Sequence, residues 1–324
     1  IGMANRRQAP QARRLSRTRH ALAEHPETDH SDPSHRITMT ASSLELKAPA
    51  KLNLFLHVVG QRSDGMHLLE SVLGLIDLCD DIVLELDPSG EITRTGDVVG
   101  DVEKDLCVRA ARALQQASGT TLGCRILVKK RIPAGAGMGG GSSDCASTLM
   151  GLNKLWGLNW PRKKLMPIGE SLGADVPFFL FGQNAFAQGT GGILRPMAVP
   201  SAWAAIVMPS QPTATALIFQ HPALTRDTKS LKISSLSQQL SNQWPEPIGR
   251  NDLQPVAVRI NPEIGKALQT LGSGARMTGS GSAVFALFDS EKNAAEALGS
   301  VTYPMRGYVA KILQEHPSVD CLAS

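Results

Sequence analysis

A glycine-rich segment in the first half of the chain has the composition of an anion-binding loop. Residues 133–144 read Pro-Ala-Gly-Ala-Gly-Met-Gly-Gly-Gly-Ser-Ser-Asp and include five glycines. Glycines let the backbone approach a ligand closely and let successive N–H groups converge on an anion. A helix is expected directly after the segment, and the N-terminus of a helix attracts negative charge. The segment therefore predicts a phosphate site, where the hydroxyls of Ser142 and Ser143 suit a phosphate or a magnesium ion.

Two better-known glycine motifs fit this segment less well. A P-loop needs Gly-Lys-Ser/Thr, and no lysine follows the glycines here. The pattern G-x-G-x-x-G is met by Gly135, Gly137 and Gly140, but the dinucleotide fold places an acidic residue about 20 positions later. No acidic residue lies between Asp144 and Glu170. A nucleotide-phosphate site of another kind is the better interpretation, and a flexible turn with a serine N-cap is the structural alternative.

Two charged residues outside this segment stand in apolar surroundings. Lys51 precedes the run Leu-Asn-Leu-Phe-Leu, and Asp175 stands between Gly-Ala and Val-Pro. A lysine there can stabilise a forming alkoxide and the transferred phosphoryl group, while a buried carboxylate can take or orient a hydroxyl proton. The chemistry of both residues suits phosphoryl transfer, the role that the family resemblance given below implies for them. An ordinary surface lysine and a helix-cap or turn aspartate are the structural alternatives.

Several segments together resemble the GHMP kinase superfamily and, within it, the 4-diphosphocytidyl-2-C-methyl-D-erythritol kinases. The glycine-rich segment resembles the superfamily's phosphate loop, and Thr-Gly-Ser-Gly at 278–281 resembles its third motif. Three more segments resemble the kinase family: Ala-Pro-Ala-Lys-Leu-Asn-Leu-Phe at 48–55, Asp-Gly-Met-His at 64–67 and Leu-Gly-Ala-Asp-Val-Pro-Phe-Phe at 172–179. The combination and its order are far more specific than any one motif.

The resemblance runs over residues 47–313 and implies a fold and an activity. The fold is α+β, a two-domain GHMP kinase fold with helices packed on largely antiparallel sheets and the active site between the domains. The activity is ATP- and Mg²⁺-dependent phosphorylation of the 2-hydroxyl of the cytidine-diphosphate-linked methylerythritol, in the methylerythritol phosphate route to isoprenoids. The alternatives are a kinase of the same fold for another small alcohol, of homoserine or mevalonate type, and a catalytically silent nucleotide-binding member.

The resemblance also implies roles for individual residues. Lys51 and Asp175 are the expected catalytic pair. The expected ATP site comprises three residues on the adenine side and the glycine segment, namely Lys130, Asp105, Leu106, Pro133, Ala134, Gly135, Ala136, Gly137, Met138, Gly139, Gly140, Gly141, Ser142 and Ser143. The expected substrate site comprises Asn53, His67, Met66 and Phe219. No residue is assigned as a metal ligand.

The residues at the cytidine end of this expected site have separate roles. The resemblance implies that His67 recognises the cytosine and that Phe219 stacks on it. Met66 stands where the family usually has tyrosine, and a methionine packs on a ring through its sulfur more weakly than a second ring does. Two further departures are Asp105, where the family usually has asparagine, and Gln188, where glutamate is common.

Sequence patterns also predict the elements that position these residues. Strands are expected at 44–47, 52–59, 66–78, 81–86, 124–128, 203–208, 275–278, 282–288 and 307–313. Helices are expected at 104–118, 144–155, 161–172, 213–219, 231–241, 251–271 and 291–298. Strand runs mixed with helix runs favour the α+β class. We expect two domains, 39–201 and 202–324, after an N-terminal extension at 1–38.

Composition disfavours several other classes of protein. The 324 residues are 42% apolar, which gives room for two cores, but no run of about 18 apolar residues predicts a membrane span. Only eight Phe, four Trp and two Tyr are present, which disfavours a nucleic-acid platform of stacked rings. The five cysteines are scattered without a C-x-x-C pair, as in reduced thiols of a cytoplasmic protein. We expect a small-molecule substrate, no nucleic-acid or membrane partner, and a monomer or homodimer.

The first 38 residues differ from the rest of the chain. They contain seven Arg and four acidic residues, a net charge of +3 out of the whole chain's +4. They also contain four of the eight His and no aromatic residue. Such a composition cannot bury enough surface to offset its ordering entropy and predicts a disordered extension. A translated upstream region with Met39 near the natural start is the favoured interpretation, and a targeting peptide is the alternative.

Overall fold

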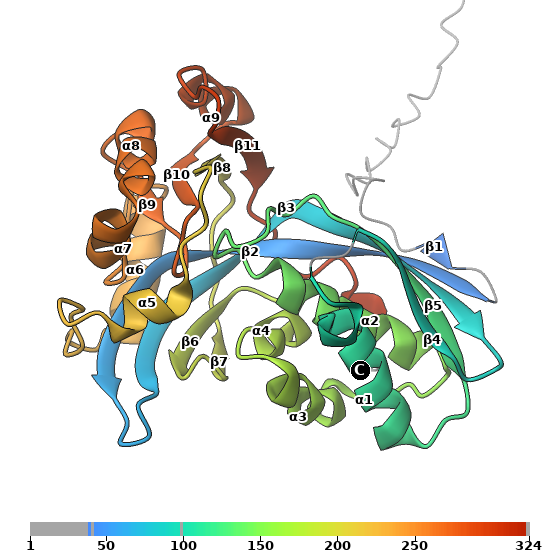
Figure 1. Ribbon diagram of the computed structural model, residues 1–324. Helices are drawn as coiled ribbons and strands as arrows, with labels where there is room; N and C mark the ends of the chain where they lie inside the picture. The colour runs from blue at the N-terminus through green and yellow to red at the C-terminus, as the bar shows by residue number, and fades with distance from the viewer. Residues whose placement is uncertain (1–37, 40–41, 98–99, 322–324) are drawn as a thin grey trace, which may run out of the picture. The chain divides into compact units, whose positions relative to one another are not determined.

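The larger of two sheets is built on two long neighbouring strands. In the computed structural model, which describes residues 38–39, 42–97 and 100–321, β2 (Ser43–Gln61) and β3 (His67–Asp87) pair antiparallel along almost their whole length (Figure 1). Sequence patterns predict a break within each strand. The break is absent because the register shifts at irregularities, one of them between Pro49 and Ala50, while the pairing continues on either side.

Five shorter strands complete this sheet. β1 (Thr38–Met39) pairs with β2, whereas β5 (Gly123–Lys129) and β6 (Ala185–Gly189) pair with two different stretches of β3. β7 (Ile193–Pro196) pairs antiparallel with β6, and β4 (Ile92–Gly96) pairs parallel with β5. Sequence patterns miss β4, β6 and β7, which are only four or five residues long. Residues 1–37 of the predicted N-terminal extension lie outside the described residues.

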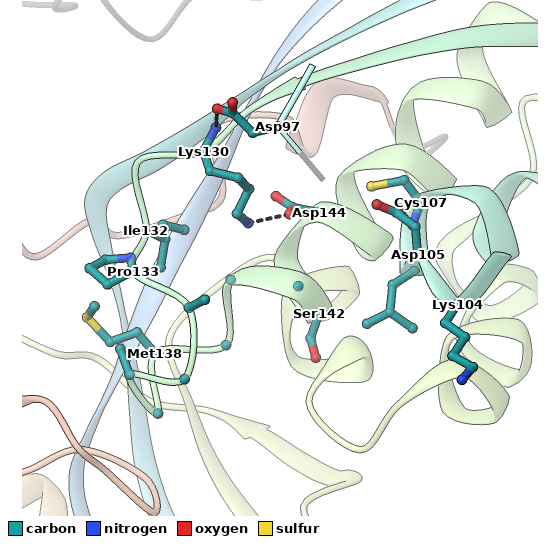
Figure 2. Close-up of a pocket in the computed structure, with 18 of the residues that line it drawn as sticks. Asp97, Lys104, Asp105, Cys107, Lys130, Ile132, Pro133, Met138, Ser142 and Asp144 are labelled. Atoms are coloured by element: carbon teal, nitrogen blue, oxygen red, sulfur yellow. Dashed lines mark hydrogen bonds and ion pairs between the residues drawn. The ribbon is translucent and has the colours of Figure 1, made fainter. Parts of the chain in front are cut away.

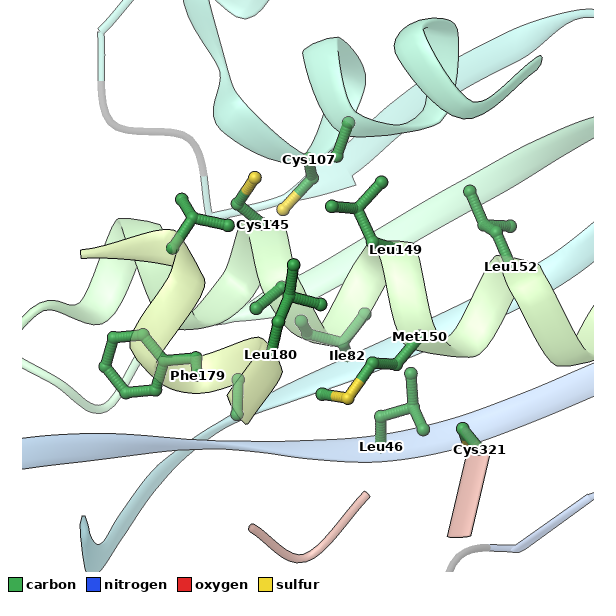
Figure 3. Packing of buried hydrophobic residues seen from close by; sticks show 14 of the residues in the cluster. Leu46, Ile82, Cys107, Cys145, Leu149, Met150, Leu152, Phe179, Leu180 and Cys321 are labelled. Carbon is green, nitrogen blue, oxygen red and sulfur yellow. The ribbon is translucent and has the colours of Figure 1, made fainter. Parts of the chain in front are cut away.

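Four helices pack together beside this sheet. The central helix is α2 (Gly140–Leu155), which is buried along most of its length and contacts β2 and β3, with α1 (Leu106–Ser118), α3 (Arg162–Leu172) and α4 (Val176–Phe181) around it. Figure 3 shows Met150 of α2 beside Leu46 and Ile82 of the sheet, while Leu149 projects from the other side of the helix near Cys107 of α1. The helix comes this close because Gly151 has no side chain: a Cβ there would lie 2.5 Å from Leu46 and Leu84.

Residues typical of helix caps stand at both ends of α1. Its predicted C-cap, Gly119, has the left-handed backbone conformation (φ +70°) that favours glycine. Its N-cap is Asp105, whose carboxylate accepts hydrogen bonds from the N–H groups of Cys107 and Val108. The helix is two residues shorter at its start than predicted, because Val102–Lys104 forms a separate 3₁₀ turn.

The smaller sheet belongs to the second half of the chain. β8 (Trp203–Met208) lies between β11 (Arg306–Lys311) and β10 (Val284–Phe288), and β9 (Arg276–Met277) pairs with the far side of β10. Every pair in this sheet is antiparallel. The described residues of both sheets form one compact unit. Mixed helices with largely antiparallel sheets confirm the α+β class.

Five helices belong to the half of the chain that forms this second sheet. They are α5 (Thr215–Gln220), α6 (Ile233–Gln243), α7 (Gln254–Ile260), α8 (Pro262–Leu271) and α9 (Glu291–Ala297). The 3₁₀ turn Val319–Cys321 packs against α2 instead. The single helix predicted at 251–271 is two helices, because Pro262 starts a new helix and Asn261 caps it through Glu263 N–H. In the ranges that the structure describes, no helix has the length and apolar composition needed to cross a bilayer. All five cysteines are free and buried.

Candidate active site

The glycine loop leads directly into α2. The helix begins at Gly140 with Gly139 as its N-cap, so both serines lie within the helix rather than before it. Gly135, Gly137 and Gly139 all have positive φ angles, which residues with a side chain rarely adopt. Gly137 has a second constraint, since a Cβ there would lie 2.4 Å from the carbonyl oxygen of Thr278. The loop therefore needs glycine at these positions for its shape.

A cavity of about 410 Å³ opens over this loop. Figure 2 shows its wall, in which the loop and the start of α2 lie opposite the start of α1. The predicted ATP-site residues in the wall are Asp105, Leu106, Lys130 and every residue from 133 to 142. Ser143 is the exception: its side chain is fully buried, and its hydroxyl has no hydrogen-bond partner among the described residues. The expectation that the Ser143 hydroxyl faces a phosphate is wrong, because α2 turns this residue into the core.

Four charged side chains of this cavity form two ion pairs, Arg94 with Asp105 and Lys130 with Asp144. The Asp105 carboxylate caps α1 and also accepts a 3.2 Å bond from Nε of Arg94. Lys130 Nζ donates to Asp80 and, at 2.5 Å, to Oδ2 of Asp144. Burial raises the pKa of Asp144 to about 7, although the positive charge of Lys130 opposes the rise. Asp105 and Lys130 therefore already have protein partners at the edge of the cavity.

A second cavity, of about 420 Å³, lies on the other side of the same loop. Gly135, Gly137, Gly139 and Ser142 line both cavities. The second cavity also contains Lys51, Asn53, Asp175 and Phe219 in its wall. A phosphate held on the loop would therefore face both the first cavity and the predicted transfer centre.

Lys51 is held inside the protein by hydrogen bonds on β2. Its side chain is buried, and its Nζ donates to the carbonyl of Gly137 at 2.7 Å and to Oδ1 of Asn53. Burial lowers the pKa of Lys51, and the nearby negative charge of Asp175 opposes this effect. The alternative of an ordinary surface lysine is wrong. An ammonium fixed against the loop backbone is placed to neutralise charge on a phosphoryl group there.

Asp175 occupies the N-cap position of α4, yet its side chain makes no capping hydrogen bond. The residue is exposed and lines the second cavity. The expectation of a buried carboxylate is wrong, because the turn that precedes α4 lies on the rim of this cavity. An acceptor that does not cap its own helix is available to a hydroxyl in the cavity.

Asn53 connects Lys51 to both halves of the chain. Its Oδ1 accepts from Lys51, its Nδ2 donates to the hydroxyl of Ser71 at 2.8 Å, and its N–H donates to Oγ1 of Thr278 at 2.9 Å. Its amide oxygen therefore serves to orient the lysine. Sequence reasoning misses Ser71, for which the only signal is a small polar residue in a strand that is otherwise largely apolar.

The predicted cytidine residues are only partly brought together. The rings of His67 and Phe219 lie 4.9 Å apart at a tilt of 40°. Nε2 of His67 accepts a 3.1 Å bond from Nε of Arg226. Burial and the charge of Arg226 lower the pKa of His67. Because Arg226 donates to Nε2, that nitrogen is the acceptor and the hydrogen of the ring lies on Nδ1, for which the described residues supply no hydrogen-bond partner.

Two residues at this end differ from the sequence expectation. Met66 is 50% exposed at the end of the β2–β3 hairpin and lines neither cavity, so the structure does not place it against Phe219. Sequence reasoning misses Arg226, whose guanidinium donates to the carbonyls of Phe219, His221 and Leu224 besides bonding His67. Nothing in the sequence around Arg226 marks this role.

Comparison with known proteins adds relatives to this geometry. Two family models match the chain, the GHMP kinases N terminal domain at residues 105–183 and the GHMP kinases C terminal at residues 230–306. A 4-diphosphocytidyl-2-C-methyl-D-erythritol kinase of Thiobacillus denitrificans is 49% identical over 276 residues, which cover 84% of this chain and 96% of that protein.

Solved structures of related kinases are also similar to this chain. A crystal structure of 4-(cytidine 5'-diphospho)-2C-methyl-D-erythritol kinase has a TM-score of 0.72 at 34% identity, covering 83% of this chain and 98% of that one. A homoserine kinase from Cytophaga hutchinsonii shares the fold, with a TM-score of 0.63 at 18% identity over 86% of this chain and 96% of that one.

Proposed function

The chain belongs to the 4-diphosphocytidyl-2-C-methyl-D-erythritol kinase family of GHMP kinases, and from this premise we propose how its own residues carry the reaction. It is an ATP-dependent kinase that phosphorylates the 2-hydroxyl of 4-diphosphocytidyl-2-C-methyl-D-erythritol in the methylerythritol phosphate pathway to isoprenoid precursors. The observation that carries the residue assignment is the shared wall of the two cavities, with Lys51 and Asp175 facing the loop from the second.

We place the triphosphate of ATP on the glycine loop at the N-terminus of α2. Backbone N–H groups and the helix dipole favour the negative charge there. The adenine lies toward Asp105, Leu106 and Lys130, which line the first cavity with the loop. Ser142 is the serine that faces the phosphates, because it lines both cavities.

Phosphoryl transfer then takes place beside Lys51 and Asp175. Phosphoryl transfer depends mainly on positioning and charge stabilisation. Asp175 accepts a hydrogen bond from the attacking 2-hydroxyl and aligns its oxygen with the terminal phosphorus. Lys51, oriented by Asn53 and by the Gly137 carbonyl, neutralises charge that develops on the transferred group.

Magnesium fits this arrangement as an ion that arrives with ATP. The described part of the chain contains no group of three His, Cys, Asp or Glu side chains that could cage a metal. Mg²⁺ does not need one, since it keeps several waters and binds through one or two carboxylates and the substrate phosphates. We propose Ser142 and Asp175 as the oxygen donors that would hold it. The ion would supply neutralisation of the phosphate charge.

The cytidine group binds at the far end of the second cavity. Phe219 lines this cavity and offers a ring face to the cytosine. His67 does not line the cavity, but its ring lies 4.9 Å from that of Phe219, and we propose its Nδ1–H as a donor to the base. We propose Met66 as a flexible apolar side chain that closes over the base once it is bound, since it is exposed without the base.

We propose the wider organisation on the same basis as the sequence expectation. The N-terminal domain spans 39–201 with the glycine loop, the C-terminal domain spans 202–324, and residues 1–38 are an extension that the kinase does not need. The protein acts in the cytoplasm, as a monomer or homodimer, on a small molecule and without a nucleic-acid or membrane partner. Deletion of residues 1–38 with no change in turnover would support this division.

One assay tests the substrate assignment against its alternatives. The protein is incubated with ATP, Mg²⁺ and, in separate reactions, the cytidylated methylerythritol, homoserine or mevalonate, and ADP release is followed. We expect release with the cytidylated alcohol alone. Release with homoserine or mevalonate instead would favour the other small-alcohol kinases, and no release with any alcohol would favour a silent nucleotide-binding member.

A further inference from the structure

Three charged side chains meet where the two ends of the glycine loop come together. Asp80 lies on β3 and is completely buried, and Asp144 lies in the second turn of α2 and is 5% exposed. Lys130, which precedes the loop, lies between them, and its side chain is 17% exposed. Figure 2 shows Lys130 directed across the cavity wall toward Asp144. One ammonium therefore serves two buried carboxylates.

Asp80 holds the backbone at the entrance of the loop. Its Oδ1 accepts from the N–H groups of Arg131 at 2.5 Å and Ile132 at 2.8 Å, while its Oδ2 accepts from Lys130. Both oxygens of this carboxylate are used, as a buried carboxylate requires. The residues just before Pro133 are thereby fixed to the central strand of the larger sheet.

Asp144 holds the exit of the loop to the same ammonium. Its Oδ2 accepts from Lys130 at 2.5 Å, and its Oδ1 is buried without a hydrogen-bond partner in the described part of the chain. Without Lys130, the charges of Asp80 and Asp144 would repel each other across a site of low polarity. The ion pairs therefore keep the start of α2 next to the strand that enters the loop.

The middle of the loop has separate attachments. The carbonyls of Gly135 and Ala136 accept from the N–H groups of Ser282 and Ala283, at 3.3 and 3.2 Å. These bonds lead to the second half of the chain and do not reach the ends of the loop. The loop ends have other contacts as well: the N–H of Lys130 donates to Oδ2 of Asp97 at 2.9 Å, and the carbonyl of Met138 accepts from the N–H of Lys51 at 3.0 Å. The contribution of Asp80, Lys130 and Asp144 is that they join the entrance of the loop to its exit.

We propose that Asp80, Lys130 and Asp144 form a clasp that sets the two ends of the glycine loop for ATP, with Asp80 and Asp144 as positioning residues. This inference rests on the proposed placement of ATP on that loop. Backbone N–H groups bind a phosphate well only when they already point at it, and a misplacement of about 1 Å can cost about 100-fold. Lys130, which is shared by two carboxylates, acts mainly as the centre of the clasp.

The test compares two neighbouring aspartates on β3. In Asp80→Asn, the amide oxygen can still accept from the backbone, but the amide NH₂ opposes the Lys130 ammonium and the ion pair is lost. Asp81→Asn is the matched control, because Asp81 pairs instead with Lys47 at 2.5 Å and Arg131 at 2.6 Å. Binding of a non-hydrolysable ATP analogue is measured by calorimetry, and both KM values and kcat are measured by ADP release.

We expect Asp80→Asn to weaken binding of the ATP analogue by about tenfold, with the KM of the alcohol and kcat at saturating ATP within about twofold of wild type. Asp81→Asn should leave all three values within about twofold. A purely structural role would lower the thermal midpoint without separating the ATP affinity from the other two values. A folded Asp80→Asn protein with unchanged affinity for the analogue overturns the proposal.

A second variant covers the case in which Asp80→Asn does not fold. Asp144→Asn keeps an oxygen for Lys130 but removes a carboxyl group that, with its pKa raised to about 7, carries only part of a charge at pH 7, and we expect it to weaken binding of the analogue by about threefold. Unchanged affinity in this variant also overturns the proposal. The analogue binds without the alcohol, so these results stand even if wild-type protein turns over another alcohol and the proposed substrate is the part that fails.

Discussion

The proposed nucleotide end of the site consists mainly of backbone, whereas the proposed cytidine end consists of side chains. The nucleotide end is the backbone of one continuous loop, which both halves of the chain hold in place. Lys51 of the larger sheet donates to the carbonyl of Gly137, and Ala283, which directly precedes β10 of the smaller sheet, donates to that of Ala136. Most of its binding groups are peptide N–H groups, whose positions follow from the fold.

The cytidine end consists of side chains from separate segments. His67 comes from the start of β3, Phe219 from α5 and Arg226 from the loop that follows. Met66, which precedes His67, is half exposed. We therefore expect each single side-chain substitution at the cytidine end to weaken binding of the alcohol substrate by the loss of one contact. At the nucleotide end, ATP binding should be weakened mainly by substitution of the groups that hold the loop backbone in place.

The largest expected effect lies between the two ends. Asp175→Asn and Lys51→Met should each lower kcat by about 100-fold or more while the ATP analogue still binds, because charge placed for the transition state acts mainly on the chemical step. Single-turnover assays with saturating substrates measure this. Lys47→Met is the control, since Lys47 lies on the same strand and pairs with Asp81 away from the cavities. Near-normal turnover in either variant would remove that residue from the transfer centre.

A smaller effect is expected at Arg226. Its guanidinium bonds Nε2 of His67 and the carbonyl of Phe219, so Arg226→Gln should release both groups that face the cytosine. The KM of the cytidylated alcohol should rise by about tenfold, with the KM of ATP unmoved. Arg259→Gln, at an exposed position on α7, serves as control. A shift in the KM of ATP instead would mean that the two ends of the site have been exchanged.

The smallest change in binding is expected at Met66. An aromatic pair contributes about 0.5–1.5 kcal/mol beyond burial, and a sulfur–ring contact about 0.3–1.5 kcal/mol. Because these ranges overlap, Met66→Tyr should lower the KM of the cytidylated alcohol only a few-fold, and saturation curves measure this. A fall in this KM of more than about tenfold would exceed the expected difference between the two contacts and would show that Met66 does not reach the bound base.

The stability of the folded protein should depend on pH through His316, a buried residue that lies against α2. Burial lowers the pKa of His316 to about 3, from 6.5. Its Nδ1 accepts from the N–H of Ser318, and its Nε2 lies 3.3 Å from the hydroxyl of Ser147 on α2. Below pH 6.5 the imidazole of His316 becomes protonated in the unfolded chain, whereas in the native protein it stays neutral until the pH approaches 3. The free energy of unfolding should therefore fall as the pH drops toward 3.

Denaturant titrations across this pH range check the prediction. His316→Gln has no group that titrates there, so its free energy of unfolding should fall less steeply than that of the wild type. Activity at pH 7 should be equal in both proteins, because His316 is far from its protonated form there. Identical slopes in the two proteins would show that other groups cause the acid sensitivity.

The sequence predicts the shape of the glycine loop well because its signals are local. Positive φ angles favour glycine, so the glycines at 135, 137 and 139 indicate the conformation of the loop. The helix after the loop and the cap at Gly119 follow from similar local rules. Even here the helix begins four residues earlier than predicted, which turns the side chain of Ser143 into the core.

What the sequence leaves out depends on contacts between distant segments. Asp80 and Lys130 are 50 positions apart, and Arg226 and His67 are 159 positions apart. No periodicity or motif joins such pairs. The exposure of Asp175 is also a tertiary property, since its apolar neighbours along the chain pack inward while the residue itself lies on a cavity rim.

The most direct test of the two-ended site is Phe219→Ala in a matrix of ATP and alcohol concentrations. Removal of the ring should raise the KM of the cytidylated methylerythritol by about tenfold, since base stacking on an aromatic ring contributes about 1–3 kcal/mol, and should leave the KM of ATP within about twofold. A rise in the KM of ATP with an unchanged KM for the alcohol would contradict the assignment of the two ends.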